Sequence, residues 1–320
     1  MRRFVLFASF FLIILIIDGF HCTSAGDNNT KNAGKMDQEE KYREATGAGR
    51  FYEQDPGKLQ GHLSQLFRDA KSSHLNPDEK LKALIVPHAG YVFSGKIAAS
   101  AYQLLDPKKE YGTLFLVGPS HRTSFDGASV YTGGHYKTPL GNVKVDLELA
   151  QKLIKENRQF HFYEEAHAKE HALEVQLPFL QYHLKNDFRI VPIVLGTRSP
   201  KTIREIAAAL KPYFEKGNLF IISTDFSHYP EYEDAVKVDR RTAHAIISNS
   251  TQNLMDTIEK NRDAGISDLR TSLCGWNAVM TLLNITENKQ DINYTILDYQ
   301  NSGDTQFANK NRVVGYYSIM

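Results

Sequence analysis

Cysteine is nearly absent from this sequence: Cys22 and Cys274 are its two cysteines among 320 residues. Cys22 lies in an N-terminal segment with the features of a cleaved export signal, so we expect the mature chain to retain Cys274 alone. A single cysteine excludes an intramolecular disulfide. In an oxidising compartment a lone thiol persists when it is buried or bound. Cys274 is therefore either a small core residue or a ligand.

An excess of charge of one sign is also missing. The chain has 38 Lys and Arg against 37 Asp and Glu, a formal net charge of +1, and its basic residues do not cluster. Nothing in this pattern indicates a nucleic-acid or strongly acidic partner. Internal repeats are missing too, which argues against a solenoid or propeller. We therefore expect a globular domain with no nucleic-acid partner.

The N-terminus carries an apolar run, from Phe4 to Ile17, directly after two arginines. It is shorter than the roughly 20 residues of a membrane-spanning helix, and small residues follow at 23–25. This pattern is typical of a signal peptide, residues 1–25, and predicts export to the periplasm or cell envelope with no membrane span after its removal. An uncleaved anchor is the weaker alternative. A lipid anchor at Cys22 is disfavoured because His21 stands where a small residue is expected.

Residues 26–47 are polar and lack apolar periodicity, so we expect a disordered tether there. Residues 48–320 alternate apolar runs with amphipathic stretches, which favours one α/β domain: a three-layer α/β/α sandwich with a mixed central sheet. The expected strands are 84–86, 112–118, 188–195, 219–223, 294–299 and 313–319. The expected helices are 94–105, 146–157, 171–183, 199–214, 235–261 and 276–283, and a hairpin is expected around 138–141.

Three of the expected strands deliver acid or imidazole side chains at their carboxyl ends. His88 follows the first, after a Pro87 that cannot continue the ladder. His121 follows the second behind a Gly-Pro turn, and Asp225 and His228 follow the strand 219–223. Ligands of open α/β sheets bind beyond the carboxyl ends of the strands. These side chains are thus expected to converge on one site.

Cys274 precedes an apolar helix and is the fifth candidate for the same site. With His88 and His121 it makes a soft set of three metal ligands, and three protein ligands leave a coordination position open. Ligation also holds the thiol as thiolate. Asp225 and His228 would then orient ligands or act as a general base. The structural alternative is a set of ordinary core histidines.

Two rival sites compete with this metal centre. His167, Glu170 and His171 form the pattern H-x-x-E-H, which on one helix is typical of an inverted zinc peptidase, and otherwise is a polar helix edge. Cys274 and His228 are candidates for a nucleophile and its base. No residue pattern marks an oxyanion hole for that pair, so the metal centre is the better interpretation.

The candidate residues stand in blocks that resemble the Memo family, also called AmmeMemoRadiSam system protein B. The blocks run in family order and span nearly everything after the tether. They are AGRFYEQDP at 48–56, VPHAGYVFSG at 86–95, GPSHR at 118–122, EHALEVQLPFLQ at 170–181, STDFSHY at 223–229 and SLCGWNAV at 272–279.

The resemblance implies a fold similar to class III extradiol dioxygenases, which are non-haem iron enzymes. His88, His121 and Cys274 match the family's metal-binding positions, Asp225 lines the same pocket, and His228 matches the dioxygenases' acid/base histidine. Cys274 stands where those enzymes carry a carboxylate. A thiolate shifts the preference toward copper or a differently tuned iron, so ring cleavage does not carry over directly.

The resemblance also implies partners. Memo relatives are linked to a radical-SAM protein and an AMMECR1-like protein, and animal members to phosphotyrosine peptides and cell motility; export makes such cytoplasmic roles doubtful here. Our leading hypothesis is a metal-dependent, dioxygenase-like oxidoreductase with one iron(II) or copper ion and an unknown small-molecule or peptide ligand. His228 would be its acid/base and Asp225 the orienter of His228. The alternative is a non-catalytic metal- or ligand-binding module at the cell envelope.

Overall fold

The computed structural model describes residues 40–71, 80–214, 217–287, 289–307 and 309–320. Within them the strands form one mixed eleven-stranded sheet. Its spatial order is β1 (Tyr42–Arg43), β5 (His135–Thr138), β6 (Gly141–Val145), β8 (Arg189–Leu195), β3 (Thr113–Pro119), β9 (Leu219–Ser223), β2 (Ala83–Val86), β11 (Gly315–Ile319) and β10 (Ile296–Asn301). Two short strands, β4 (Ala128–Val130) and β7 (Phe160–His161), pair beside β8. The expected hairpin is present as β5 and β6, which pair antiparallel.

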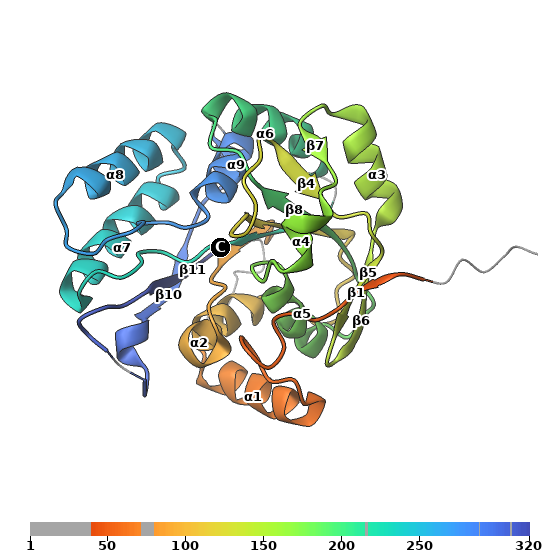
Figure 1. Cartoon of the computed structure of the whole chain (residues 1–320), viewed down its shortest axis with the longest axis horizontal. Coiled ribbons are helices and arrows are strands. Elements are labelled where there is room, and N and C mark those ends of the chain that lie inside the picture. The colour runs from red at the N-terminus through yellow and green to blue at the C-terminus, as the bar shows by residue number, and fades with distance from the viewer. Residues whose placement is uncertain (1–39, 72–79, 215–216, 288, 308) are drawn as a thin grey trace, which may run out of the picture. The chain divides into compact units, whose positions relative to one another are not determined.

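Helices cover both faces of this sheet (Figure 1). They are α1 (Pro56–Asp69), α2 (Tyr91–Tyr102), α3 (Leu147–Glu156), α4 (Glu164–Ala168), α5 (Leu177–His183), α6 (Pro200–Phe214), α7 (Tyr232–Ile247), α8 (Thr251–Asp263) and α9 (Trp276–Thr286), with 3-10 turns η1 (Glu174–Gln176) and η2 (Ser302–Asp304). Successive strand residues enter different cores: Leu84 packs with α1 and α2, and Ile85 with α6 and α9. The expected three-layer α/β sandwich with a mixed sheet is therefore confirmed.

The centre of the sheet explains why the predicted strand ends come together. β8, β3, β9 and β2 are adjacent and parallel. Their side chains are apolar on both faces, as expected for strands buried between two helix layers. The chain leaves β2, β3 and β9 at the same edge, which places the segments after Val86, Pro119 and Ser223 next to one another.

Three helix predictions differ from the structure, each for a local reason. The first helix begins at Tyr91 with Gly90 as its N-cap, and Ser94 lies inside it, donating to the Ala89 carbonyl. The helix expected over 171–183 is a turn, η1 and then α5, with Pro178 in the first turn of α5. The helix expected over 235–261 is two helices, because Asn249 has a φ of 50° and Ser250 caps α8.

Only some of the N-terminal predictions concern residues that the structure describes. The predicted signal peptide, including Cys22, and residues 26–39 of the predicted tether lie outside the described residues. The boundary at residue 48 is too late, because β1 pairs with β5 and Arg43 is buried in a network described below. Among the described helices, none is both long and apolar enough to cross a membrane.

Candidate metal centre

His88 is fixed by two contacts that follow directly from its place after β2. Its backbone N–H donates to Asp225 Oδ1 at 2.8 Å, and its ring Nδ1 lies 2.8 Å from Ser223 Oγ. The Ser223 hydroxyl donates to the Ala172 carbonyl at 2.7 Å, so it accepts from His88 Nδ1. This arrangement assigns the proton to Nδ1 and leaves the lone pair on Nε2. Burial lowers the pKa of His88 well below its ordinary value, so the ring is neutral.

His121 is held in the same manner by a buried carboxylate. Glu170 accepts from the His121 backbone N–H at 2.7 Å and faces its Nδ1 at 2.9 Å. Burial alone would raise the pKa of Glu170, but the hydrogen bond and charge of His121 outweigh burial and hold that pKa at about 2. An ionised Glu170 accepts the Nδ1 proton. Burial alone would lower the pKa of His121, but the hydrogen bond and charge of Glu170 outweigh burial and raise it, so a metal ion at Nε2 would compete with a proton there. A carboxylate behind a histidine is the usual support of a metal ligand.

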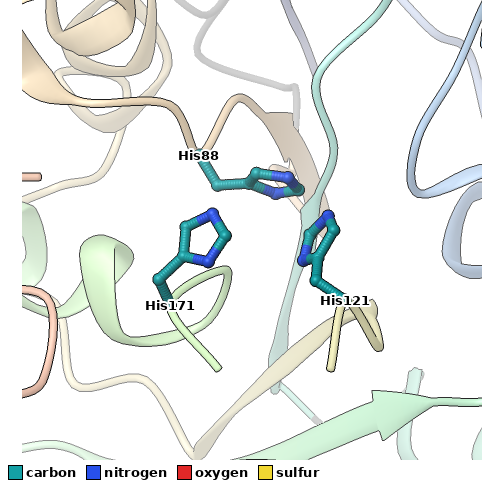
Figure 2. A group of neighbouring side chains, drawn as sticks. All are labelled: His88, His121 and His171. Carbon is teal, nitrogen blue, oxygen red and sulfur yellow. The ribbon is translucent and has the colours of Figure 1, made fainter. Parts of the chain in front are cut away.

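His171 is the third imidazole of the group. His88, His121 and His171 each offer one ligand atom, and these three atoms lie within 4.8 Å of one another, a spacing that can hold a metal ion. Figure 2 shows their rings facing a common point from three separate segments of the chain. Burial first, and then electrostatic repulsion from His88, lower the pKa of His171 to about 3. This ring is therefore also neutral and able to bind a metal.

Cys274, a ligand predicted from the sequence, lies beside this group in the loop before α9 but is not one of its three members. Its backbone N–H donates to the Asp225 carbonyl, and its Sγ accepts from the Asp225 N–H at 3.2 Å. The same Sγ lies 3.2 Å from His88 Nε2. Burial raises the pKa of Cys274 far above its ordinary value, so without a metal the thiol keeps its proton. A protonated thiol that faces His88 instead of His228 does not fit the Cys–His nucleophile pair.

Asp225 and His228 are adjacent but not hydrogen-bonded. Asp225 Oδ2 lies 4.0 Å from His228 Nε2 and 3.9 Å from His88 Nε2. Burial raises the pKa of Asp225 and lowers that of His228. His228 Nε2 is buried and has no hydrogen-bond partner among the described residues. The expected orientation of His228 by Asp225 is therefore absent, and Asp225 instead holds the amide of His88.

The structure contradicts the zinc-peptidase alternative. His167 lies in the last turn of α4. Its Nε2 is 2.9 Å from the Ser129 hydroxyl, and its ring packs on Tyr131. Burial lowers the pKa of His167 to about 3. Because the helix stops at Ala168, His167 and His171 do not project from one helix face, and His167 is outside the metal-binding group. Glu170 supports His121 and is not positioned as a peptidase base.

Known proteins are similar to this chain over most of its length. A model of the Memo-like protein family matches residues 43–320. The chain belongs to the Memo-like family. A MEMO1 family protein of Saccharolobus solfataricus is 34% identical over 280 residues, which cover 84% of this chain and 95% of the relative. A MEMO1 family protein of Sulfurisphaera tokodaii is 31% identical over 283 residues, covering 85% and 96%.

Among solved structures, an uncharacterized protein of Escherichia coli K12 aligns with a TM-score of 0.42 at 13% identity. The alignment covers 73% of this chain and 98% of that protein. The family match begins at Arg43, which agrees with a folded region that starts before residue 48.

The residues predicted from the sequence lie together, but they do not include every neighbouring imidazole. The structure brings His88, His121, Cys274, Asp225 and His228 together. Two further residues, Glu170 and His171, were placed in the rival peptidase motif. The available signal was that both stand at the start of a block that resembles the family, whereas His167 precedes it.

Proposed function

We propose that this protein is a mononuclear redox-metal protein, with iron(II) or copper bound by His88, His121 and Cys274 and with dioxygenase-like activity on a small substrate. The observation that carries the proposal is the contact between His88 Nε2 and Cys274 Sγ at 3.2 Å, beside the cluster of imidazoles. His171 lies within reach of the same ion as a fourth donor.

The donor set fits a metal ion on geometric grounds. Typical bond lengths of about 2.0 Å to imidazole and about 2.3 Å to thiolate place two donors of one ion roughly 3.1–3.6 Å apart. The separation of His88 Nε2 and Cys274 Sγ lies in this range. Because burial raises the pKa of Cys274 and keeps the thiol protonated, an ion bound to Sγ would displace that proton. A bound iron or copper ion would supply one-electron redox chemistry.

The side chains around the donors suit proton transfer and anchoring. His228 is neutral because burial lowers its pKa, and its Nε2 has no partner among the described residues, so it can accept a substrate proton. Asp225 fixes the His88 loop through the amide of His88. His121 is the most exposed of the three imidazoles, so a small substrate would reach the ion from solvent past His121.

A measurement of oxygen consumption tests this proposal. We expect anaerobically reconstituted iron protein to consume oxygen with catechol faster than free iron does. His228→Ala should lower the rate by about 100-fold or more, the usual contribution of a general acid or base. His244→Ala, an exposed histidine on α7, is the matched control and should leave the rate unchanged. A wild-type rate at the free-iron level would overturn the catalytic part of the proposal.

One observation favours a second candidate, a non-catalytic metal-binding module at the cell envelope. His228 is not aligned by a hydrogen bond to Asp225, because their nearest atoms are 4.0 Å apart. General-base histidines usually have an orienting partner. Tight binding of one metal ion, with no oxygen consumption and no effect of His228→Ala, would support this module in place of the enzyme.

A further inference from the structure

A strap of chain before α1, residues 43–52, is anchored to the centre of the molecule by Glu174, whose side chain is fully buried. Glu174 Oε2 accepts from Arg43 Nη1 at 2.5 Å and from the Thr46 amide at 3.1 Å. Glu174 Oε1 accepts from the Gly47 amide at 2.7 Å and the Tyr52 hydroxyl at 2.6 Å. Such a fully bonded buried charge fixes the position of the strap.

The same strap bonds to two of the segments that carry metal-binding histidines. Arg43 Nε donates to the His167 carbonyl at 2.9 Å, and Arg43 Nη2 donates to the Glu170 carbonyl at 2.7 Å. On the other side, the Tyr91 amide donates to the Phe51 carbonyl at 2.8 Å. The strap thus joins the loop of His171 to the start of α2, just after His88.

Phe51 is the strap residue that contacts the cluster itself. Its ring stacks on the His171 imidazole with centroids 4.1 Å apart and planes 18° from parallel. His171 lies 5.0 Å from His121 and 5.5 Å from His88, measured between ring centroids. Phe51 therefore covers the His171 ring, which in turn contacts both other imidazoles.

His171 needs this contact because it lacks the support that the other two histidines have. Ser223 bonds to the Nδ1 of His88, and Glu170 bonds to the Nδ1 of His121. His171 Nδ1 is 3.3 Å from Glu170 Oε1 but makes no hydrogen bond with any described residue. With no hydrogen bond there to orient the ring, stacking against a fixed aromatic side chain sets its plane.

We propose that Phe51 is a positioning residue of the metal centre, which holds His171 in the plane in which it donates to the ion. This inference rests on the proposed metal site and goes further, because it assigns His171 to the site and gives the strap a role in it. Loss of the stack should leave His88, His121 and Cys274 in place while weakening the fourth donor.

Titration with Co²⁺ alone, followed by its visible absorption bands, tests the proposal. Phe51→Ala should weaken Co²⁺ binding about two- to tenfold and change the band shape, whereas Phe51→Tyr, which keeps the ring, should restore both. Phe51→Leu fills similar space without a ring and should behave like Phe51→Ala, which separates stacking from packing. Phe67→Ala is the matched control, because it removes a Phe67–His183 stack (5.2 Å, 7°) on another surface.

The double variant decides whether Phe51 acts through His171. In a His171→Ala background, Phe51→Ala should have no further effect on Co²⁺ affinity or spectrum. An equal loss with and without His171, or unchanged binding by Phe51→Ala and Phe51→Leu, would overturn the inference while leaving the metal site intact. Failure of the wild-type protein to bind Co²⁺ would overturn both the inference and the proposed metal site.

Discussion

At the residue scale, Asp239 is a buried acid near the site that the proposed chemistry does not use. Its Oδ1 accepts from the Ser227 amide at 2.8 Å, and its Oδ2 lies 2.9 Å from the Tyr299 hydroxyl. Burial raises its pKa from 3.8 to about 7. The folded protein therefore keeps a proton on Asp239 at pH values where the unfolded chain has lost it.

We predict that this acid makes the protein less stable as pH rises. Between about pH 4 and pH 7 the unfolded state binds fewer protons at Asp239 than the folded state does, so the Asp239 contribution to the free energy of unfolding falls with rising pH, by about 1.4 kcal/mol per unit. The buried histidines, whose pKa values are lowered, contribute in the opposite sense, so the effect of Asp239 is the difference between wild type and variant. In Asp239→Asn the loss due to Asp239, about 4 kcal/mol in total, should disappear. Urea unfolding across this range checks it, with exposed Asp187→Asn as control. Parallel curves for Asp239→Asn and wild type would contradict the assignment.

Glu170 changes the stability of the folded protein in the opposite sense, and at lower pH. Its pKa is held at about 2, so its contribution to stability is present above its ordinary value of 4.5 and is lost as pH falls toward 2. The two windows barely overlap. The difference between the pH series of wild type and Asp239→Asn therefore isolates the burial of Asp239 from the support of His121 by Glu170 and from the buried histidines.

At the element scale, the loop before α9 is pressed against the end of β9. The Gly275 amide donates to Thr224 Oγ1 at 2.9 Å, and a Cβ at Gly275 would lie 2.7 Å from the Ser223 carbonyl oxygen. Backbone at that distance cannot move aside cheaply. Glycine at 275 is thus what lets Cys274 approach His88.

Gly275→Ala should therefore destabilise the protein by about 1–3 kcal/mol and weaken metal binding, because the Cys274 loop must move outward. Gly61→Ala is the matched control: it lies within α1 and a Cβ there meets no atom within 4 Å. That change should stabilise by about 0.5–1 kcal/mol through helix propensity. Urea unfolding and a metal titration measure both effects. If Gly275→Ala proved as stable as Gly61→Ala, the close-packing explanation would be wrong.

The elements also explain which parts of the site were predictable. His88, His121 and Asp225 follow buried strands that end at Pro or small residues, and this pattern is local in the sequence. The position of His171 depends on Glu170 bonding to His121 and on Arg43 reaching the same loop. Both contacts join residues more than forty positions apart, so helical periodicity over 171–183 gave the wrong structure there.

At the scale of the whole molecule, one sheet edge collects the site from distant parts of the chain. β2, β3 and β9 are neighbours in the sheet and place their following loops together. The strap bonds to the Glu170 carbonyl and to the Tyr91 amide, and Cys274 bonds to Asp225, so both segments contact these loops. Figure 1 shows the central sheet between its two helix layers. The match to the Memo-like family spans residues 43–320, which include all of these segments. The α/β architecture was predictable because the central strands β2, β3, β8 and β9 are separate apolar runs.

The central claim is that one metal ion is bound at this edge with a thiolate ligand. X-ray absorption at the metal edge, with elemental analysis of the same anaerobically loaded sample, tests it most directly. We predict about one ion per chain and one sulfur neighbour at about 2.3 Å, which is lost in Cys274→Ser. Binding of no ion, or a neighbour shell of nitrogen and oxygen alone that is identical in wild type and Cys274→Ser, would contradict the claim.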